Sequence, residues 1–192
     1  YISDFHNPEM VSKTIDYHAW EIQPTEFILK ILSKFCREKK LELEILGRTE
    51  YYLEEINFYK KFNLPFSFIK KKIENYSFLS SEAIVVGMSS TLIYESFSRM
   101  FRTAFFDIRN SFYLLNKLKP GFAFPDKTEN FGKFWSNIPK EEKMYENLKF
   151  LYSVSESDWS DIVKNWSKFL MVHNHNNLIY KQILKKEGLY NF

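Results

Sequence analysis

Short apolar runs alternate with helical stretches through the first half of the chain. Residues 83–86 form an uninterrupted apolar run that ends at Gly87. Such a run is typical of a parallel strand that is covered on both faces. Residues 27–35 instead repeat apolar side chains at helical spacing, and basic residues follow at 37–40, where the helix dipole favours them. Alternating strands and helices indicate crossover units.

The predicted fold class is α/β, a Rossmann-like doubly wound parallel sheet with helices on both faces and a helical C-terminal tail. A polar loop runs from residue 4 to about Trp20. Tyr1 lies in what looks like the end of a strand, so we expect the chain to be a piece of a longer protein. We expect strands at residues 1–3, 41–46, 66–69, 83–86 and 103–108. We expect helices over residues 24–40, 50–62, 90–100 and 178–187. A short helix should begin at Pro139, and a longer one should run from Trp159 towards Met171.

The charge pattern bears on which partners the chain can bind, and the cysteine content bears on the cellular compartment. The 27 basic and 24 acidic residues are interspersed, so no nucleic-acid partner is expected. The densest basic cluster, Lys70–Lys72, fits a solvated strand end, with an anionic ligand or a headgroup surface as the alternative. The single Cys36 excludes an internal disulfide. No apolar run approaches the ~20 residues of a membrane span. We therefore expect no transmembrane segment and a cytoplasmic protein, with the inner face of the membrane as a compatible place.

The turn Gly87–Thr91 carries the best candidate chemistry. It joins a buried strand to a helix, and open parallel sheets bind ligands at that edge. A helix start offers unpaired N–H groups and a positive dipole end, and Ser89, Ser90 and Thr91 add hydroxyl donors. The alternative is that one serine merely caps the helix. Glu95, one turn later, either accepts ribose or sugar hydroxyls or faces solvent.

Residues 83–96 resemble the donor-site turn in the C-terminal domain of GT-B glycosyltransferases, and most closely a bacterial surface-carbohydrate biosynthesis family. The stretch from residues 121–125 to Phe134 and Trp135 is similar as well. The resemblance implies that residues 1–192 form a single Rossmann-like nucleotide-sugar-binding domain, the C-terminal lobe of a two-lobe protein. Gly87, Ser89, Ser90 and Thr91 would then hold the phosphate of an activated sugar.

A second group, Gly47, Arg48 and Thr49, follows an earlier predicted strand and would lie along the same edge. The planar guanidinium of Arg48 suits phosphate oxygens, although a surface arginine on a loop is an equal alternative. His6 and His18 in the first loop could approach the cleft between the lobes or be solvated. His173 and His175 have no acidic or cysteine partner at metal spacing, so no zinc site is expected.

The predicted function is that of the donor-binding lobe of a glycosyltransferase, which transfers a sugar from a nucleotide-sugar to a bacterial surface glycan. The acceptor would be a glycan or a lipid-linked molecule, and the scheme needs no cofactor or metal. A CMP-linked acidic sugar is an attractive donor, because a serine-rich turn suits a single phosphate. In such transferases the general base usually belongs to the other lobe, so no catalytic residue is assigned, and the isolated lobe need not be active.

Two alternatives stay open. The same fold and turn would serve an epimerase or a hydrolase of sugar nucleotides. A noncatalytic interaction module is a different class, in which the aromatic-rich loop from Phe112 to Trp135 supplies a partner surface and the serines only cap a helix.

Overall fold

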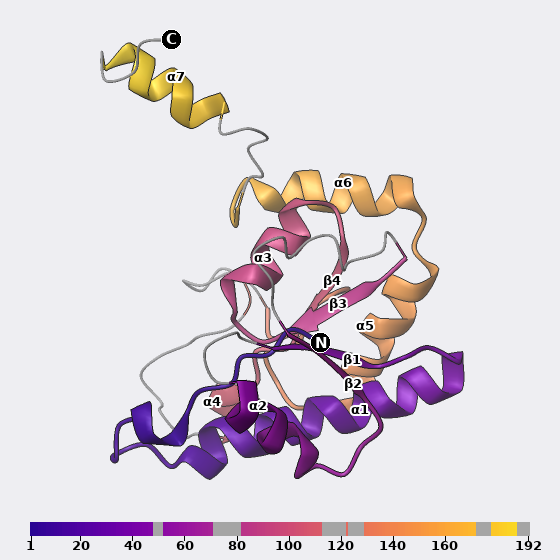
Figure 1. Ribbon diagram of the computed structural model, residues 1–192. Coiled ribbons are helices and arrows are strands. Elements are labelled where there is room, and N and C mark those ends of the chain that lie inside the picture. The colour runs from indigo at the N-terminus through magenta and orange to yellow at the C-terminus, as the bar shows by residue number, and fades with distance from the viewer. Residues whose placement is uncertain (48–51, 71–81, 113–121, 123–128, 172–177, 188–192) are drawn as a thin grey trace.

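The computed structural model describes residues 1–47, 52–70, 82–112, 122, 129–171 and 178–187 (Figure 1). The chain is a mixed α/β protein, as predicted. Its strands are β1 (Glu44–Gly47), β2 (Ser67–Lys70), β3 (Ile84–Gly87) and β4 (Arg102–Phe105). Its helices are α1 (Gln23–Lys39), α2 (Tyr52–Lys60), α3 (Thr91–Ser98), α4 (Arg109–Phe112), α5 (Glu141–Ser153), α6 (Glu156–Ser167) and α7 (Leu178–Lys186), with a 3-10 helix at Pro8–Met10 and a π-helix at His18–Ile22.

The described strands form two parallel pairs, β1 with β2 and β3 with β4. Parallel pairing requires a crossover between the two strands, and this agrees with the alternating pattern of the sequence. The predicted apolar run becomes β3, in which Val85 and Val86 are only 3% and 2% exposed. Its continuous hydrophobic character therefore reflects burial on both faces.

The first residues of the chain lie between the two strand pairs. The Ile2 N–H donates to the Val86 carbonyl at 2.7 Å, on the side of β3. On the side of β1, the Leu46 N–H donates to the Tyr1 carbonyl at 2.8 Å, and the Ser3 N–H donates to the Leu46 carbonyl at 2.9 Å. The Tyr1–Ser3 segment, predicted as a strand, is thus hydrogen-bonded to both pairs.

A segment far along the chain extends the hydrogen bonding beyond β4. The Phe105 N–H donates to the Phe134 carbonyl at 3.0 Å, and the Ser136 N–H donates back to the Phe105 carbonyl at 2.9 Å. Phe105 and Trp135 form a parallel bridge. Residues 134–136 therefore border the β3–β4 pair on its outer side.

Helices α3 and α5 both contact the β3–β4 pair, and they lie on opposite sides of it in Figure 1. Helix α1 packs against α5, and α6 packs against α3. The pair is therefore the centre of a layered arrangement in which β3 ends at the turn that carries the candidate site.

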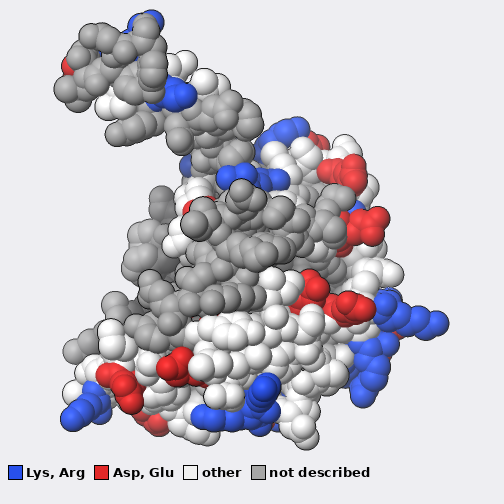
Figure 2. All heavy atoms as spheres, viewed as in Figure 1, with Lys and Arg blue, Asp and Glu red and all other residues white. Residues whose placement is uncertain are grey.

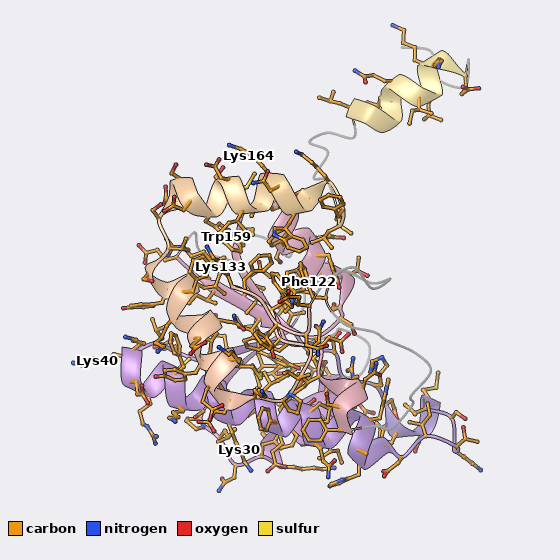
Figure 3. The ribbon with its side chains drawn as sticks, turned by 180° about the vertical axis from the view of Figure 1, so that it is seen from behind. Lys30, Lys40, Phe122, Lys133, Trp159 and Lys164 are labelled. Carbon is orange, nitrogen blue, oxygen red and sulfur yellow. The ribbon has the colours of Figure 1, made fainter. Side chains whose placement is uncertain are left out.

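Aromatic rings fill the space between this pair and α6. Phe97 and Phe134 stack with their centroids 5.4 Å apart, and Trp159 meets both rings edge-on at 5.6 Å. Phe122 packs on Phe105 at 4.6 Å, and Figure 3 shows Trp159 extending from α6 into the interior where Phe122 also lies. Of the described aromatic side chains in the loop considered as a partner surface, Phe122, Phe134 and Trp135 are core residues with 1%, 1% and 8% exposed, whereas Phe131 is 37% exposed.

Several boundaries differ from the prediction. The helix that was predicted to start at residue 24 begins earlier, because a π-helical turn at His18–Ile22 leads directly into α1. Pro24 is the second residue of α1 and follows this π-helical turn directly. The predicted short helix after Pro139 is α5, with 13 residues. The predicted interruption at 173–177 and the glycine at 188 lie outside the described residues.

Candidate functional site at the carboxyl edge of the strands

The turn between β3 and α3 presents its hydroxyl groups at the surface. Ser89 and Thr91 are exposed and Ser90 is half-buried. Ser90 occupies the N-cap position of α3, yet its side chain makes no capping hydrogen bond. The alternative that the serines are there to cap the helix is therefore not supported by the geometry of this turn.

Asp4 occupies part of the turn that was expected to bind phosphate. Its Oδ2 accepts hydrogen bonds from the N–H groups of Met88 at 3.1 Å and Ser89 at 2.9 Å. The Asp4 side chain is buried, and it follows directly on the Tyr1–Ser3 segment. These two amides are thus paired with an internal carboxylate, which leaves the hydroxyl groups as the part of the turn that faces outward.

Arg109, the first residue of α4, joins the turn to the rest of the site. Its Nη1 donates to Ser89 Oγ at 3.1 Å, and its Nη2 donates to the Asp4 carbonyl at 3.2 Å and to Glu21 Oε2 at 2.9 Å. The guanidinium lies 4.9 Å from the ring centroid of Trp20. Although the residue is only 6% exposed, it reaches three segments that are far apart in the sequence.

Glu21 is the buried carboxylate that holds this arginine, and it also contacts His6. Glu21 is 0% exposed, and its Oε2 lies 3.2 Å from His6 Nδ1. The His6 ring packs on Trp20 with the centroids 4.7 Å apart. The Tyr17 hydroxyl donates to the His6 carbonyl at 2.7 Å. The loop predicted for residues 4–20 is therefore folded back over the edge of the strands.

The electrostatic balance of the site follows from burial. Burial by itself lowers the pKa of Arg109, but Glu21 and Asp4 more than offset this, so the net shift of the pKa is upward and the residue stays cationic. Burial raises the pKa of the Asp107 carboxyl, while Arg109 opposes that shift. Within the described part of the chain, Glu21 Oε1 and Arg109 Nε are buried without a hydrogen-bond partner.

The other predicted site residues have different fates. Gly47 and Gly87 end β1 and β3, the two strands that flank Tyr1–Ser3, so the structure brings these two glycines to one edge as expected. A side chain at Gly47 would lie 2.9 Å from Glu55 Oε2 and closer still to the Phe68 ring, which gives this glycine a packing role. Glu95 is half-buried within α3. The structure does not describe Arg48 and Thr49.

Four buried charged residues of the site were not predicted from the sequence: Asp4, Glu21, Asp107 and Arg109. Asp4 directly follows a predicted strand, and Asp107 and Arg109 lie at the end of another. Polar residues at strand ends are the signal that could have found these three. Glu21 lies between the predicted loop, which ends at about Trp20, and the helix predicted from residue 24, and no local pattern marked it.

Metal binding, membrane crossing and surface charge can each be assessed for the described residues. No group of three or more His, Cys, Asp or Glu side chains among them is arranged to hold a metal ion. No described helix combines the length and the apolar character needed to cross a membrane. Figure 2 shows Lys and Arg interspersed with Asp and Glu over the described surface of one face. The expectation that the chain binds no nucleic acid stays a prediction.

Comparison with known proteins gives one match. A family model described as "putative O-antigen biosynthesis protein" matches residues 3–188. No curated protein and no solved structure matches the chain. The matched range contains the whole of the described site, from Asp4 to Arg109.

Proposed function

Because the chain belongs to this family of O-antigen biosynthesis proteins, we propose that it is the nucleotide-sugar-binding domain of a glycosyltransferase that builds a bacterial surface glycan. Membership of the family supports a role in surface carbohydrate biosynthesis. The reaction is inferred from the site. The nucleotide-sugar is the donor substrate, and a glycan or a lipid-linked molecule is the acceptor, in the cytoplasm or at the inner face of the membrane.

The backbone hydrogen bonds support a doubly wound sheet. They connect β2, β1, Tyr1–Ser3, β3, β4 and residues 134–136 in that spatial order. Numbered along the chain, this is the order 3-2-1-4-5-6 of dinucleotide-binding folds, in which the ligand binds where the strand order reverses. In a sheet of this order, that point would lie between Tyr1–Ser3 and β3. Asp4 and the Ser89 turn meet at this point.

The observation that carries the proposal is the hydrogen bond from Arg109 to Ser89 Oγ at 3.1 Å. It brings a buried cation into contact with the hydroxyl of Ser89, one of the three hydroxyl residues of the turn. A phosphate that binds to Ser89, Ser90 and Thr91 would meet a guanidinium already oriented by Glu21 and Asp4. Preorganised donors of this kind stabilise the charge that develops on a departing nucleotide phosphate.

A nucleotide screen tests the proposal. Thermal-shift and calorimetric titrations with CMP, CDP, UDP, GDP and their sugar conjugates should find at least one ligand that stabilises the chain, because a ligand that binds only the folded state adds about 2.7 kcal/mol at a concentration of 100 Kd. The Ser89→Ala/Ser90→Ala double variant should lose most of that affinity.

The matched control is Ser157→Ala, which removes an exposed hydroxyl from the first turn of α6. It should bind the same ligand as the wild-type protein does. The proposed function would be contradicted if no ligand of the panel stabilised the chain, or if the double variant bound the ligand with unchanged affinity.

A further inference from the structure

We propose that His6 is the catalytic base of this site and that Glu21 holds its imidazole in place, an inference that rests on the proposed function. A base is required because the acceptor hydroxyl must lose its proton as it attacks the sugar. The other histidine of the same segment, His18, is exposed, and its backbone N–H donates to Asp16. The sequence does not distinguish His6 from His18, but in the structure His6 contacts a buried carboxylate whereas His18 is exposed.

An unbroken path of hydrogen bonds connects His6 to the proposed phosphate position. Ser89 Oγ accepts from Arg109 Nη1 at 3.1 Å, and Arg109 Nη2 donates to Glu21 Oε2 at 2.9 Å. The same carboxylate oxygen lies 3.2 Å from His6 Nδ1. His6 therefore belongs to the group of side chains that the turn gathers, although it is 83 positions away from Ser89 in the sequence.

The contact with Glu21 determines which nitrogen of His6 is available. In neutral His6, Nδ1 carries the hydrogen and donates it to Glu21, so the lone pair is on Nε2. Glu21 is fully buried, whereas the His6 side chain is 34% exposed. Since Nδ1 is directed at the buried carboxylate, Nε2 is on the opposite edge of the ring and can meet a substrate hydroxyl.

The surroundings of His6 restrict its motion and compensate its charge. The ring of Trp20 packs against both the imidazole and the guanidinium of Arg109. The charged groups around the imidazole are Glu21, in direct contact with it, and Arg109, which shares that carboxylate. Tyr17 contacts the His6 backbone, and burial raises the pKa of its phenol, so it stays neutral. Glu21 would stabilise the imidazolium that forms when His6 accepts a proton.

The proposed step balances in atoms and charge. The acceptor hydroxyl oxygen forms a bond to the anomeric carbon of the donor sugar, and its proton passes to His6 Nε2. The bond between the anomeric carbon and the phosphate oxygen breaks, and its electron pair stays on the nucleotide phosphate. Arg109 and the Ser89 hydroxyl stabilise that charge, and His6 later releases its proton to water.

The test separates binding from turnover in the full-length protein. Donor consumption is measured with the sugar nucleotide found in the screen, with water and with a lipid-linked or glycan acceptor. His6→Gln should lower the rate at least about 100-fold, the usual contribution of a positioned acid–base group, and should leave the nucleotide Kd unchanged. His18→Gln should behave as the wild type in both assays.

Chemical rescue distinguishes a proton-transfer role from a structural one. In His6→Ala, added imidazole should restore part of the rate, because the removed side chain is partly exposed. Nucleotide binding by His6→Ala and His6→Gln serves as the check that both variants are folded.

Two outcomes overturn the assignment of His6. One is a His6→Gln protein that consumes donor at the wild-type rate, and the other is a wild-type protein that binds the nucleotide-sugar but consumes none of it with any acceptor. A wild-type protein that binds no nucleotide would instead refute the proposed function itself.

Discussion

Arg109 is a buried cation whose charge is compensated by Glu21 and by the Asp4 carbonyl oxygen. Placing a charge in the interior is expensive, and a buried pair becomes strongly destabilising when one partner is removed. The arginine therefore has two roles at the scale of the residue. It provides the positive charge of the site, and it stabilises the carboxylate that contacts His6.

Arg109→Met should lower the free energy of unfolding by about 3–5 kcal/mol, because it leaves the Glu21 carboxylate buried without its cation. Urea denaturation measures the change. Combining it with Glu21→Met should recover much of the loss, since both buried charges are then absent. Lys34→Met, which breaks the exposed Lys34–Glu141 pair, is the control and should have a far smaller effect. An Arg109→Met protein as stable as the wild type would show that the pair is not buried as described.

Helices α3 and α6 begin in different ways, and the difference bears on function at the scale of the element. At the start of α6, Ser155 Oγ accepts the N–H of Asp158 at 3.1 Å. At the start of α3, Ser90 holds the same position without such a bond. Because the Ser90 hydroxyl does not cap the helix, we propose that it binds phosphate.

Ser155→Ala should destabilise the protein by about 1 kcal/mol, the usual loss when an N-cap hydroxyl is removed. Ser90→Ala should cost clearly less, because no capping bond is lost. Ser157→Ala in the first turn of α6 provides the baseline for a serine that is not a cap. Thermal or urea unfolding of the three variants gives the comparison. An equal loss for Ser90→Ala and Ser155→Ala would indicate that the serines of the α3 turn are structural.

At the scale of the whole molecule, hydrogen bonds from distant segments connect the two short strand pairs. Ser3 and Leu46 bond the N-terminal segment to β1, and Ile2 bonds it to β3. Ser136 bonds to β4 from a later segment of the chain. These contacts are what makes the carboxyl ends of β1 and β3, with their glycines, part of one edge.

Amide hydrogen exchange tests this continuity. The N–H groups of Ser3, Leu46 and Ser136 should exchange as slowly as those within β3 and β4, because a single sheet opens them together by global unfolding. The N–H of Asn63, in the turn after α2, should exchange much faster. Fast exchange at Ser3 and Leu46, together with slow exchange within β3, would show that the two strand pairs open independently.

Much of the element order could be predicted because periodicity is a local property. The apolar run at 83–86 predicted β3. The loop predicted for residues 4–20 was partly wrong, since helical turns form at Pro8–Met10 and His18–Ile22. The second of these turns carries Trp20 and Glu21, which contact Arg109 from a distant part of the chain.

The sequence by itself determined the α/β class, the strand that leads into the Gly87–Thr91 turn and the hydroxyl residues of that turn, because each of these depends on neighbouring residues. Only the tertiary structure decided which groups meet at that turn. Asp4 reaches Met88 across 84 positions, and Arg109 reaches Glu21 across 88. No local pattern encodes these contacts, because they arise only when the crossovers bring the ends of separate strands to one edge.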